Sequence, residues 1–285
     1  MMAAQAHLDI HSKGLYGENN RRLISELSGN EFSIQRSLAR SVLAQVPKWR
    51  INSEDKETIT IKTKSLRKGM NFCADELFAD LPLVSSCSAF LVGPNLILTA
   101  AHCVKNEEEC KDNYWVLDYD DDLGFSPSTG VVKLKRENIV SCSQLLSISE
   151  NPKLDYALIQ INRTLSDRSP LKLRRRGVLS KNDSLEVIGH PMGLPKIFTD
   201  QARVIDNSLP TSFLSNADTF TGNSGSPVIN SRTHLVEGIL IRGGRDLFMD
   251  LDLGCNRFYQ CIGDECIGET VLRSTALPLN IIPKS

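Results

Sequence analysis

From residue 81 onward, the chain is a succession of short β-prone runs, each bounded by residues typical of turns. Eight such runs cover residues 89–92, 95–99, 114–117, 130–134, 156–161, 185–188, 226–229 and 236–241. Clusters of Gly, Pro, Asn and Asp separate them, such as the Gly-Pro-Asn at 93–95. Many short strands at close spacing predict an all-β barrel or sandwich.

The first 80 residues carry fewer structural signals. Residues 1–14 have no periodicity and predict a leader, and residues 15–70 are polar with basic patches. An amphipathic stretch covers residues 31–46, and the alternating run ETITIKTK at 57–64 predicts an edge strand. The 285 residues suffice for one large domain or two modest ones.

Composition excludes two classes of partner. With 33 basic and 34 acidic residues, the chain offers no excess charge for nucleic acid or an anionic membrane. No apolar run reaches the roughly 18 residues that a membrane span needs. The acidic run at 118–122 predicts a solvated loop, with a structural calcium left open.

Eight cysteines point to an oxidising compartment. Their even number fits a disulfide framework, and no C-x-x-C pair supports a metal site. We therefore expect a secreted or periplasmic protein. The opening MMAAQAHLDIHS has no apolar core of a signal peptide, so we expect that the start of the chain is trimmed or wrongly assigned. An unusual export route or an intracellular protein are the alternatives.

Three segments carry residues suited to nucleophilic chemistry. They are LTAAHC at 98–103, LDYAL at 154–158 and GNSGSP at 222–227. In this chain order, His then Asp then Ser, they resemble the chymotrypsin-like (trypsin-type) serine peptidases. The resemblance implies two six-stranded antiparallel β-barrels with the active site in the cleft between them. We expect the boundary between the barrels near residues 165–180.

The resemblance implies a catalytic triad of His102, Asp155 and Ser224. A serine hydroxyl is a weak nucleophile at neutral pH and needs an imidazole to take its proton. A buried carboxylate that accepts the Nδ1–H fixes the tautomer of that imidazole. The N–H groups of Gly222 and Ser224 can converge on the oxyanion, because glycine adopts backbone angles closed to other residues. The mechanism needs no cofactor and implies protein or peptide substrates; we expect a monomer.

The remaining histidines compete poorly for the role of base. His7 and His11 lie in the leader, His190 is next to a turn, and His234 lies in a hairpin. None of them combines a preceding small-residue turn with an adjacent cysteine, as His102 does.

The resemblance also implies a disulfide between Cys87 and Cys103 around the histidine loop. Closing a loop of about 16 residues stabilises a fold by roughly 3 kcal/mol. Cys110 and Cys142 flank the next strands and form the second expected pair. Four cysteines remain with three possible pairings: Cys73, Cys255, Cys261 and Cys266. We expect residues 255–285 to be a disulfide-tied C-terminal extension.

The start of the expected domain resembles one branch of the family. LYGENNR at 15–21 and the string GNSGSP are similar to the bacterial glutamyl endopeptidases of the V8 type. This implies a zymogen whose peptidase domain, residues 15–285, begins near Leu15 after the leader is removed. Asn223 is neutral, so it cannot form the ion pair with a new N-terminal ammonium that an Asp makes in the animal enzymes.

Substrate preference rests on a second set of residues. Asp218, six residues before Ser224, occupies the place of the acidic pocket base in the trypsin pattern and favours Lys or Arg at P1. Thr219 matches the glutamyl branch, but Leu240 stands where that branch has a histidine. Arg242 could meet an acidic side chain or pair with Asp218; alternatively, Asp218 caps a turn. The candidate pocket residues are Asp218, Thr219, Leu240, Ile241, Arg242 and Gly243.

Three other functions compete with an active peptidase. A catalytically silent member of the fold would serve as a binding or adhesion module. An esterase or lipase of another fold usually carries G-x-S-x-G and places its histidine last, whereas only His234 follows Ser224 here. A regulatory peptidase with an added domain has little room, since the barrels need about 200 residues.

Overall fold

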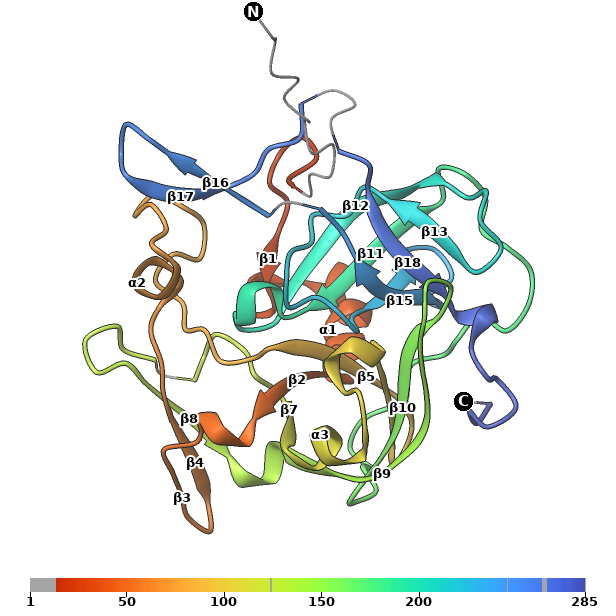
Figure 1. The fold of residues 1–285 in the computed structure, drawn as a ribbon, viewed down its shortest axis with the longest axis horizontal. Coiled ribbons are helices and arrows are strands. Elements are labelled where there is room, and N and C mark those ends of the chain that lie inside the picture. Colours follow the sequence, from red (N-terminus) through yellow and green to blue (C-terminus); the bar gives the residue numbers. More distant parts are fainter. Residues whose placement is uncertain (1–13, 124, 245, 263–265, 285) are drawn as a thin grey trace, which may run out of the picture.

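The computed structural model describes residues 14–123, 125–244, 246–262 and 266–284. Within this part of the chain, twelve strands form two closed antiparallel barrels of six strands each. Figure 1 shows the first barrel (orange to green) in the lower half and the second (cyan to blue) at the upper right. This confirms the all-β fold of two six-stranded barrels. The expected leader, residues 1–14, lies outside the described residues except for Gly14.

The first barrel has the strand order β10-β6-β5-β2-β7-β9 and closes through β9 and β10. Its strands are β2 (Val42–Pro47), β5 (Cys87–Gly93), β6 (Leu96–Thr99), β7 (Asn113–Leu117), β9 (Ile139–Glu150) and β10 (Asp155–Ile161). Every residue of β5 and β6 is buried, which explains their continuous apolar sequences CSAFLVG and LILT. Phe90, Leu98 and Trp115 fill the interior.

The second barrel follows a connection over residues 162–183. Its strands are β11 (Ser184–Gly189), β12 (Ile197–Asp206), β13 (Ser212–Ser215), β14 (Pro227–Asn230), β15 (Val236–Arg242) and β18 (Glu269–Arg273). Pairing of β12 with β13 closes it, and β1 (Arg22–Leu23) adds to the outer edge of β12. Within the expected extension at 255–285, β18 pairs with both β13 and β15, so Glu269–Arg273 is a strand of the barrel.

Short elements surround the barrels. The helices are α1 (Ser33–Ala39), α2 (Leu66–Met70) and α3 (Glu107–Lys111), so the amphipathic stretch at 31–46 divides into α1 and β2. A small sheet contains β3 (Ser53–Glu54), β4 (Thr58–Lys62) and β8 (Val131–Lys135). The alternating run at 57–64 forms β4, but it is the central strand, not an edge, because β8 pairs with its second side.

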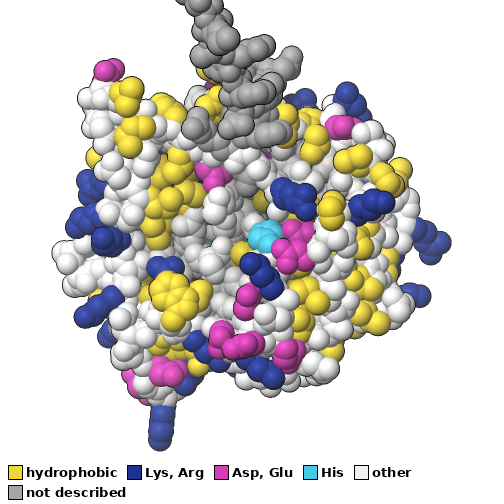
Figure 2. Space-filling model, viewed as in Figure 1, with side chains coloured by type: hydrophobic (Ala, Val, Ile, Leu, Met, Phe, Trp, Pro, Cys, Tyr) yellow, Lys and Arg dark blue, Asp and Glu magenta, His cyan; other side chains and the backbone are white. Residues whose placement is uncertain are grey.

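A hairpin of β16 (Leu247–Asp250) and β17 (Cys255–Phe258) projects at the upper left of Figure 1. Hydrophobic side chains gather on this part of the surface in Figure 2. Those of the hairpin and its turn are Phe248, Met249, Leu251 and Leu253, all exposed.

All eight cysteines are paired. The Cys87–Cys103 and Cys110–Cys142 disulfides expected from the sequence are both present. The remaining four form Cys73–Cys255, which ties the β16–β17 hairpin to the segment after α2, and Cys261–Cys266. In the described residues, no helix is both long and apolar enough to cross a membrane.

Candidate active site

His102 and Asp155 are brought together by two neighbouring strands of the first barrel. His102 lies in a 3-10 turn, Ala101–Cys103, directly after β6, and Asp155 begins β10. The pairing of Ala157 with Thr99 sets the end of β6 beside the start of β10. The imidazole Nδ1 of His102 lies 2.8 Å from Asp155 Oδ2, and the backbone N–H of His102 donates to Oδ1 at 3.2 Å.

The surroundings of Asp155 keep it ionised. The residue is 3% exposed, and this burial alone would raise the pKa of its carboxyl. Hydrogen bonds from the ring and the backbone of His102 outweigh the burial, so the pKa lies below its usual range. An ionised Asp155 that accepts from Nδ1 leaves Nε2 as the ring nitrogen able to take a proton.

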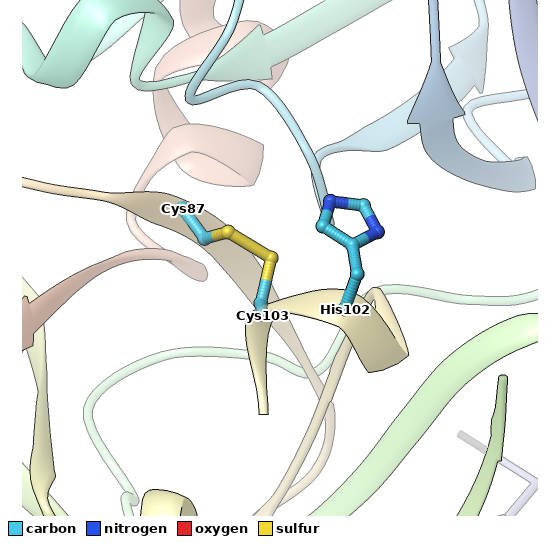
Figure 3. A group of neighbouring side chains, drawn as sticks. All are labelled: Cys87, His102 and Cys103. Atoms are coloured by element: carbon cyan, nitrogen blue, oxygen red, sulfur yellow. A yellow bond between two sulfur atoms is a disulfide. The ribbon is translucent and has the colours of Figure 1, made fainter. Parts of the chain in front are cut away.

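The disulfide beside His102 braces the turn that carries it. Figure 3 shows the Cys87–Cys103 bond linking β5 to the residue next to the imidazole. Cys87, His102 and Cys103 lie close enough to hold a metal ion. Because the two sulfurs are bonded to each other, they provide no thiolate, and we assign no metal to this group.

Ser224 lies in the connection between β13 and β14 and is fixed to the first barrel. The backbone N–H of Ser88, in β5, donates to the Ser224 carbonyl at 2.8 Å, and the Ser88 hydroxyl donates to the Gly222 carbonyl at 2.9 Å. The Cys103 Sγ atom lies 3.8 Å from the same Ser224 carbonyl oxygen. The segment with Ser224 is thereby held against the disulfide next to His102.

The backbone conformation at the two positions that flank Ser224, Gly222 and Gly225, requires glycine. Gly222 has a φ of 97° and Gly225 a φ of 87°, both in the left-handed region that favours glycine. A Cβ at Gly225 would also collide with the Ser88 carbonyl. The Thr221 carbonyl accepts from the Met192 N–H at 2.5 Å, so the trans peptide that follows directs the Gly222 N–H away from Met192.

A cleft of about 540 Å³ opens beside the imidazole. Its lining residues are His102, Glu150, Asn151, Pro152, Asp155, Ile241 and Arg242. Figure 2 shows a histidine surface near the middle of this face, with acidic and basic side chains beside it. A second pocket, of about 270 Å³, has Gly222, Met192, Thr221 and Leu247 among its lining residues.

Comparison with known proteins identifies the family. The model of the trypsin-like peptidase domain matches residues 87–239, which is more than half of the chain. The chain belongs to the trypsin-like peptidase family. His102, Asp155 and Ser224 all lie inside the matched region.

Solved structures with a similar shape have low sequence identity. A Glu endopeptidase in complex with MPD is 14% identical, with a TM-score of 0.48 over 92% of this chain and 94% of that one. The active form of the Rv3671c protease from M. tuberculosis is 15% identical, with a TM-score of 0.45 over 89% and 85%. Human heparin binding protein is 16% identical, with a TM-score of 0.47 over 68% and 82%. No curated protein matches the chain.

The residues expected to line the primary pocket of a trypsin-like peptidase are dispersed. Ile241 and Arg242 line the 540 Å³ cleft, and Gly243 is exposed after β15. Leu240 is 1% exposed in the barrel, and the Thr219 hydroxyl donates to Glu269 at 2.8 Å. Ile241 and Arg242 therefore border the cleft beside His102, whereas Leu240 and Thr219 are buried.

Asp218 is buried under the N-terminal segment. It is 3% exposed, and its Oδ1 accepts from the backbone N–H of Tyr16 at 2.7 Å. Burial raises the pKa of Asp218 to about 6, against the lowering effects of the Tyr16 hydrogen bond and the Arg21 charge. The basic side chain whose charge acts on this pKa is thus Arg21, not Arg242. The ion pair between Asp218 and Arg242 considered from the sequence does not form.

Two other groups singled out in the sequence have structural partners. His190 is fully buried beside the Tyr119 ring, and burial together with the Lys196 charge lowers its pKa to about 3, so it stays neutral. In the acidic run at 118–122, Asp118 pairs with Arg168 at 3.0 Å and Asp120 with Lys196 at 3.3 Å. Basic side chains therefore neutralise part of the negative charge of this run.

Proposed function

We propose that the protein is a serine endopeptidase in which Ser224 is the nucleophile, His102 the general base and Asp155 the residue that orients the base. The 2.8 Å contact between His102 Nδ1 and a buried, ionised Asp155 carries this proposal. The hydrogen bond from Ser88 to the Ser224 carbonyl supports it, because this bond holds the serine segment on the first barrel, with the Cys103 sulfur 3.8 Å from the same carbonyl oxygen.

The chemistry follows from these positions. Ser224 Oγ attacks the peptide carbonyl while His102 Nε2 takes its proton, which gives a tetrahedral intermediate and an imidazolium. The N–H groups of Gly222 and Ser224 donate to the oxyanion. The imidazolium then gives its proton to the leaving amine, and an acyl-enzyme remains on Ser224. Water, deprotonated by the same imidazole, hydrolyses the acyl-enzyme and restores the free hydroxyl.

Labelling with a fluorophosphonate probe tests this proposal against a silent binding module. We expect the protein to form one covalent adduct, mapped by peptide mass spectrometry to Ser224, because only an activated serine attacks phosphorus at a useful rate. The Ser224→Ala variant serves as the control and should remain unlabelled. A protein that folds but takes up no label, or takes it up at another serine, would favour the silent module.

The Lys or Arg preference expected from Asp218 is not part of this proposal. Its carboxylate accepts from Tyr16 and is covered by the N-terminal segment, so a substrate side chain would have to displace that segment. We expect Asp218→Asn to change kcat/KM by the same factor for peptides with Lys, Arg, Glu or Leu at P1. A selective loss for Lys and Arg of about tenfold or more, the effect of removing a buried charge-assisted hydrogen bond, would restore the basic pocket.

The compartment is also part of the proposal. Four disulfides persist where the surroundings are oxidising, which supports a secreted or periplasmic location. The monomeric state and activation by removal of a leader stay predictions from the sequence.

A further inference from the structure

The segment from Leu15 to Leu23 is held at both ends, by residues that follow β17 at its start and by a strand of the second barrel at its end. Its first residue makes two backbone hydrogen bonds: the Leu15 N–H donates to the Tyr259 carbonyl at 2.8 Å, and the Leu15 carbonyl accepts from the Cys261 N–H at 2.9 Å. Its last two residues are β1, paired with β12. The path of the residues between these anchors is therefore restrained. Two of these residues, Tyr16 and Arg21, contact the loop that leads to Ser224.

This loop, residues 218–224 and called the oxyanion loop below, includes Asp218, Phe220 and Gly222. Tyr16 N–H donates to the Asp218 carboxylate at 2.7 Å. The Arg21 guanidinium is buried, 3% exposed, and its central carbon lies 4.7 Å from the centre of the Phe220 ring. It also lies 4.0 Å from Phe258, so the cation is enclosed by aromatic faces.

The charges of Arg21 and Asp218 depend on each other. Burial lowers the pKa of Arg21 to about 10, and the Asp218 charge counters that effect. In return, the Arg21 charge counters the raised pKa of Asp218. Among the described residues, the Nη atoms of Arg21 and the Oδ2 atom of Asp218 have no hydrogen-bond partner, so the two charges interact through space and not as a contacting ion pair. Removing one charge would leave the other, buried charge without this compensation.

The contacts of Phe220 and Thr221 pass this restraint to the oxyanion donors. The Phe220 carbonyl accepts from Asn223 at 3.0 Å, within the turn that contains Gly222. The Thr221 N–H donates to Asp246 at 2.9 Å, and the Thr221 carbonyl accepts from Met192. Since Phe220 is two residues from Gly222, a shift of its ring would rotate the peptide whose N–H faces the oxyanion.

We propose that Arg21 is a positioning residue that holds the oxyanion loop in its catalytic conformation through Phe220 and Asp218. The inference rests on the proposed serine peptidase function. The oxyanion develops only after attack, so a misplaced Gly222 N–H should lower kcat with little effect on KM. Arg21 itself touches neither the substrate nor the reacting atoms.

The neighbouring Arg22 provides a matched control. It belongs to the same segment and also lies over aromatic rings, 4.6 Å from Phe32 and 5.3 Å from Phe198, with Asp200 as its ion-pair partner. None of these three residues belongs to the oxyanion loop. Arg22→Met should therefore weaken the anchoring of the segment without moving Gly222, whereas Arg21→Met should do both.

The experiment measures kcat, KM, melting temperature and the inhibition constant of a peptide aldehyde for the wild type, Arg21→Met, Arg21→Lys and Arg22→Met. We expect Arg21→Met to lower kcat by about 10- to 100-fold, less than the 10²–10³-fold loss of a whole donor. The aldehyde, which forms an oxyanion adduct, should bind correspondingly more weakly, while KM changes little. Arg21→Lys keeps the charge and should recover part of kcat. Arg22→Met should keep the wild-type kcat.

The outcomes test the positioning role of Arg21 separately from the proposed peptidase function. Equal kcat in Arg21→Met and Arg22→Met, with the wild type active, overturns the positioning role and leaves the peptidase intact. Equal loss of kcat and aldehyde affinity in both variants also overturns it, because anchoring alone would then explain the effect. If Arg21→Met does not fold, Arg21→Gln carries the test because it also removes the charge: wild-type kcat and aldehyde affinity in a folded Arg21→Gln contradict the proposal. A wild type unreactive toward fluorophosphonate refutes the proposed function instead.

Discussion

Replacing His102 by alanine is expected to lower kcat for peptide hydrolysis by about 10⁶-fold, the loss seen when the base of a serine triad is removed. Without the imidazole, Ser224 has no group positioned to take its proton. The backbone N–H of residue 102 still donates to Asp155, so its carboxylate keeps one partner. The side chain of His102 is 34% exposed, and its removal opens no cavity in the barrel. We therefore expect a folded protein with a small change in melting temperature.

His234→Asn is the control for that substitution. His234 has a φ of 57°, and asparagine tolerates this left-handed conformation better than alanine would. It should keep kcat within about twofold of wild type, since surface changes away from a site usually have small effects. Both variants are compared at saturating substrate and by circular dichroism. If His102→Ala keeps a kcat within tenfold of the wild type, another group acts as the base and the assignment of His102 is wrong.

The strands that the sequence reveals are the ones with a simple burial pattern. Each of the eight predicted runs forms a strand, because apolar and β-branched residues are concentrated in them. β9 was missed: over Ile139–Glu150 its burial is irregular, with exposed and half-buried residues after Cys142. β18 was also missed, since Glu269 and Arg273 are buried polar ends of a five-residue strand. In these cases the partner strands, not local propensity, determine the structure.

In the candidate site too, some features could be predicted from local sequence, whereas others depend on contacts between residues far apart in the chain. The triad segments are local motifs, and the register of β6 and β10 needs only to bring two of them together. The surroundings of Asp218 are different: its hydrogen-bond donor is the backbone of Tyr16, 202 residues away in sequence. A backbone N–H has no side-chain signature, so no pattern predicts that contact. Arg21 was visible only as part of a motif at the start of the domain, and its position under the oxyanion loop required the fold.

Asp155→Asn is expected to lower kcat/KM at pH 7 by about 10⁴-fold, with the fold retained. The asparagine side chain has nearly the shape of Asp155, but it carries no charge to stabilise the imidazolium that forms during attack. Its amide can also donate to Nδ1, which would leave Nε2 protonated and unable to act as a base. The comparison uses peptide hydrolysis at pH 7 and fluorophosphonate labelling rates, which should both fall.

Acid stability gives the same substitution a second, independent result. The pKa of Asp155 is lowered in the folded protein, mainly because the hydrogen bonds from His102 outweigh burial. A lowered pKa means that the carboxylate contributes stability above its unfolded pKa of about 3.9 and loses it as pH falls through the folded value. The melting temperature of wild type should therefore fall more steeply below pH 4 than that of Asp155→Asn.

Asp167→Asn is the control. The pKa of the Asp167 carboxyl is also lowered, by its hydrogen bond with Arg168, but this residue lies on the surface. It should reduce the acid dependence without changing kcat/KM. Equal activity of Asp155→Asn and Asp167→Asn would show that the carboxylate beside His102 does not take part in the reaction.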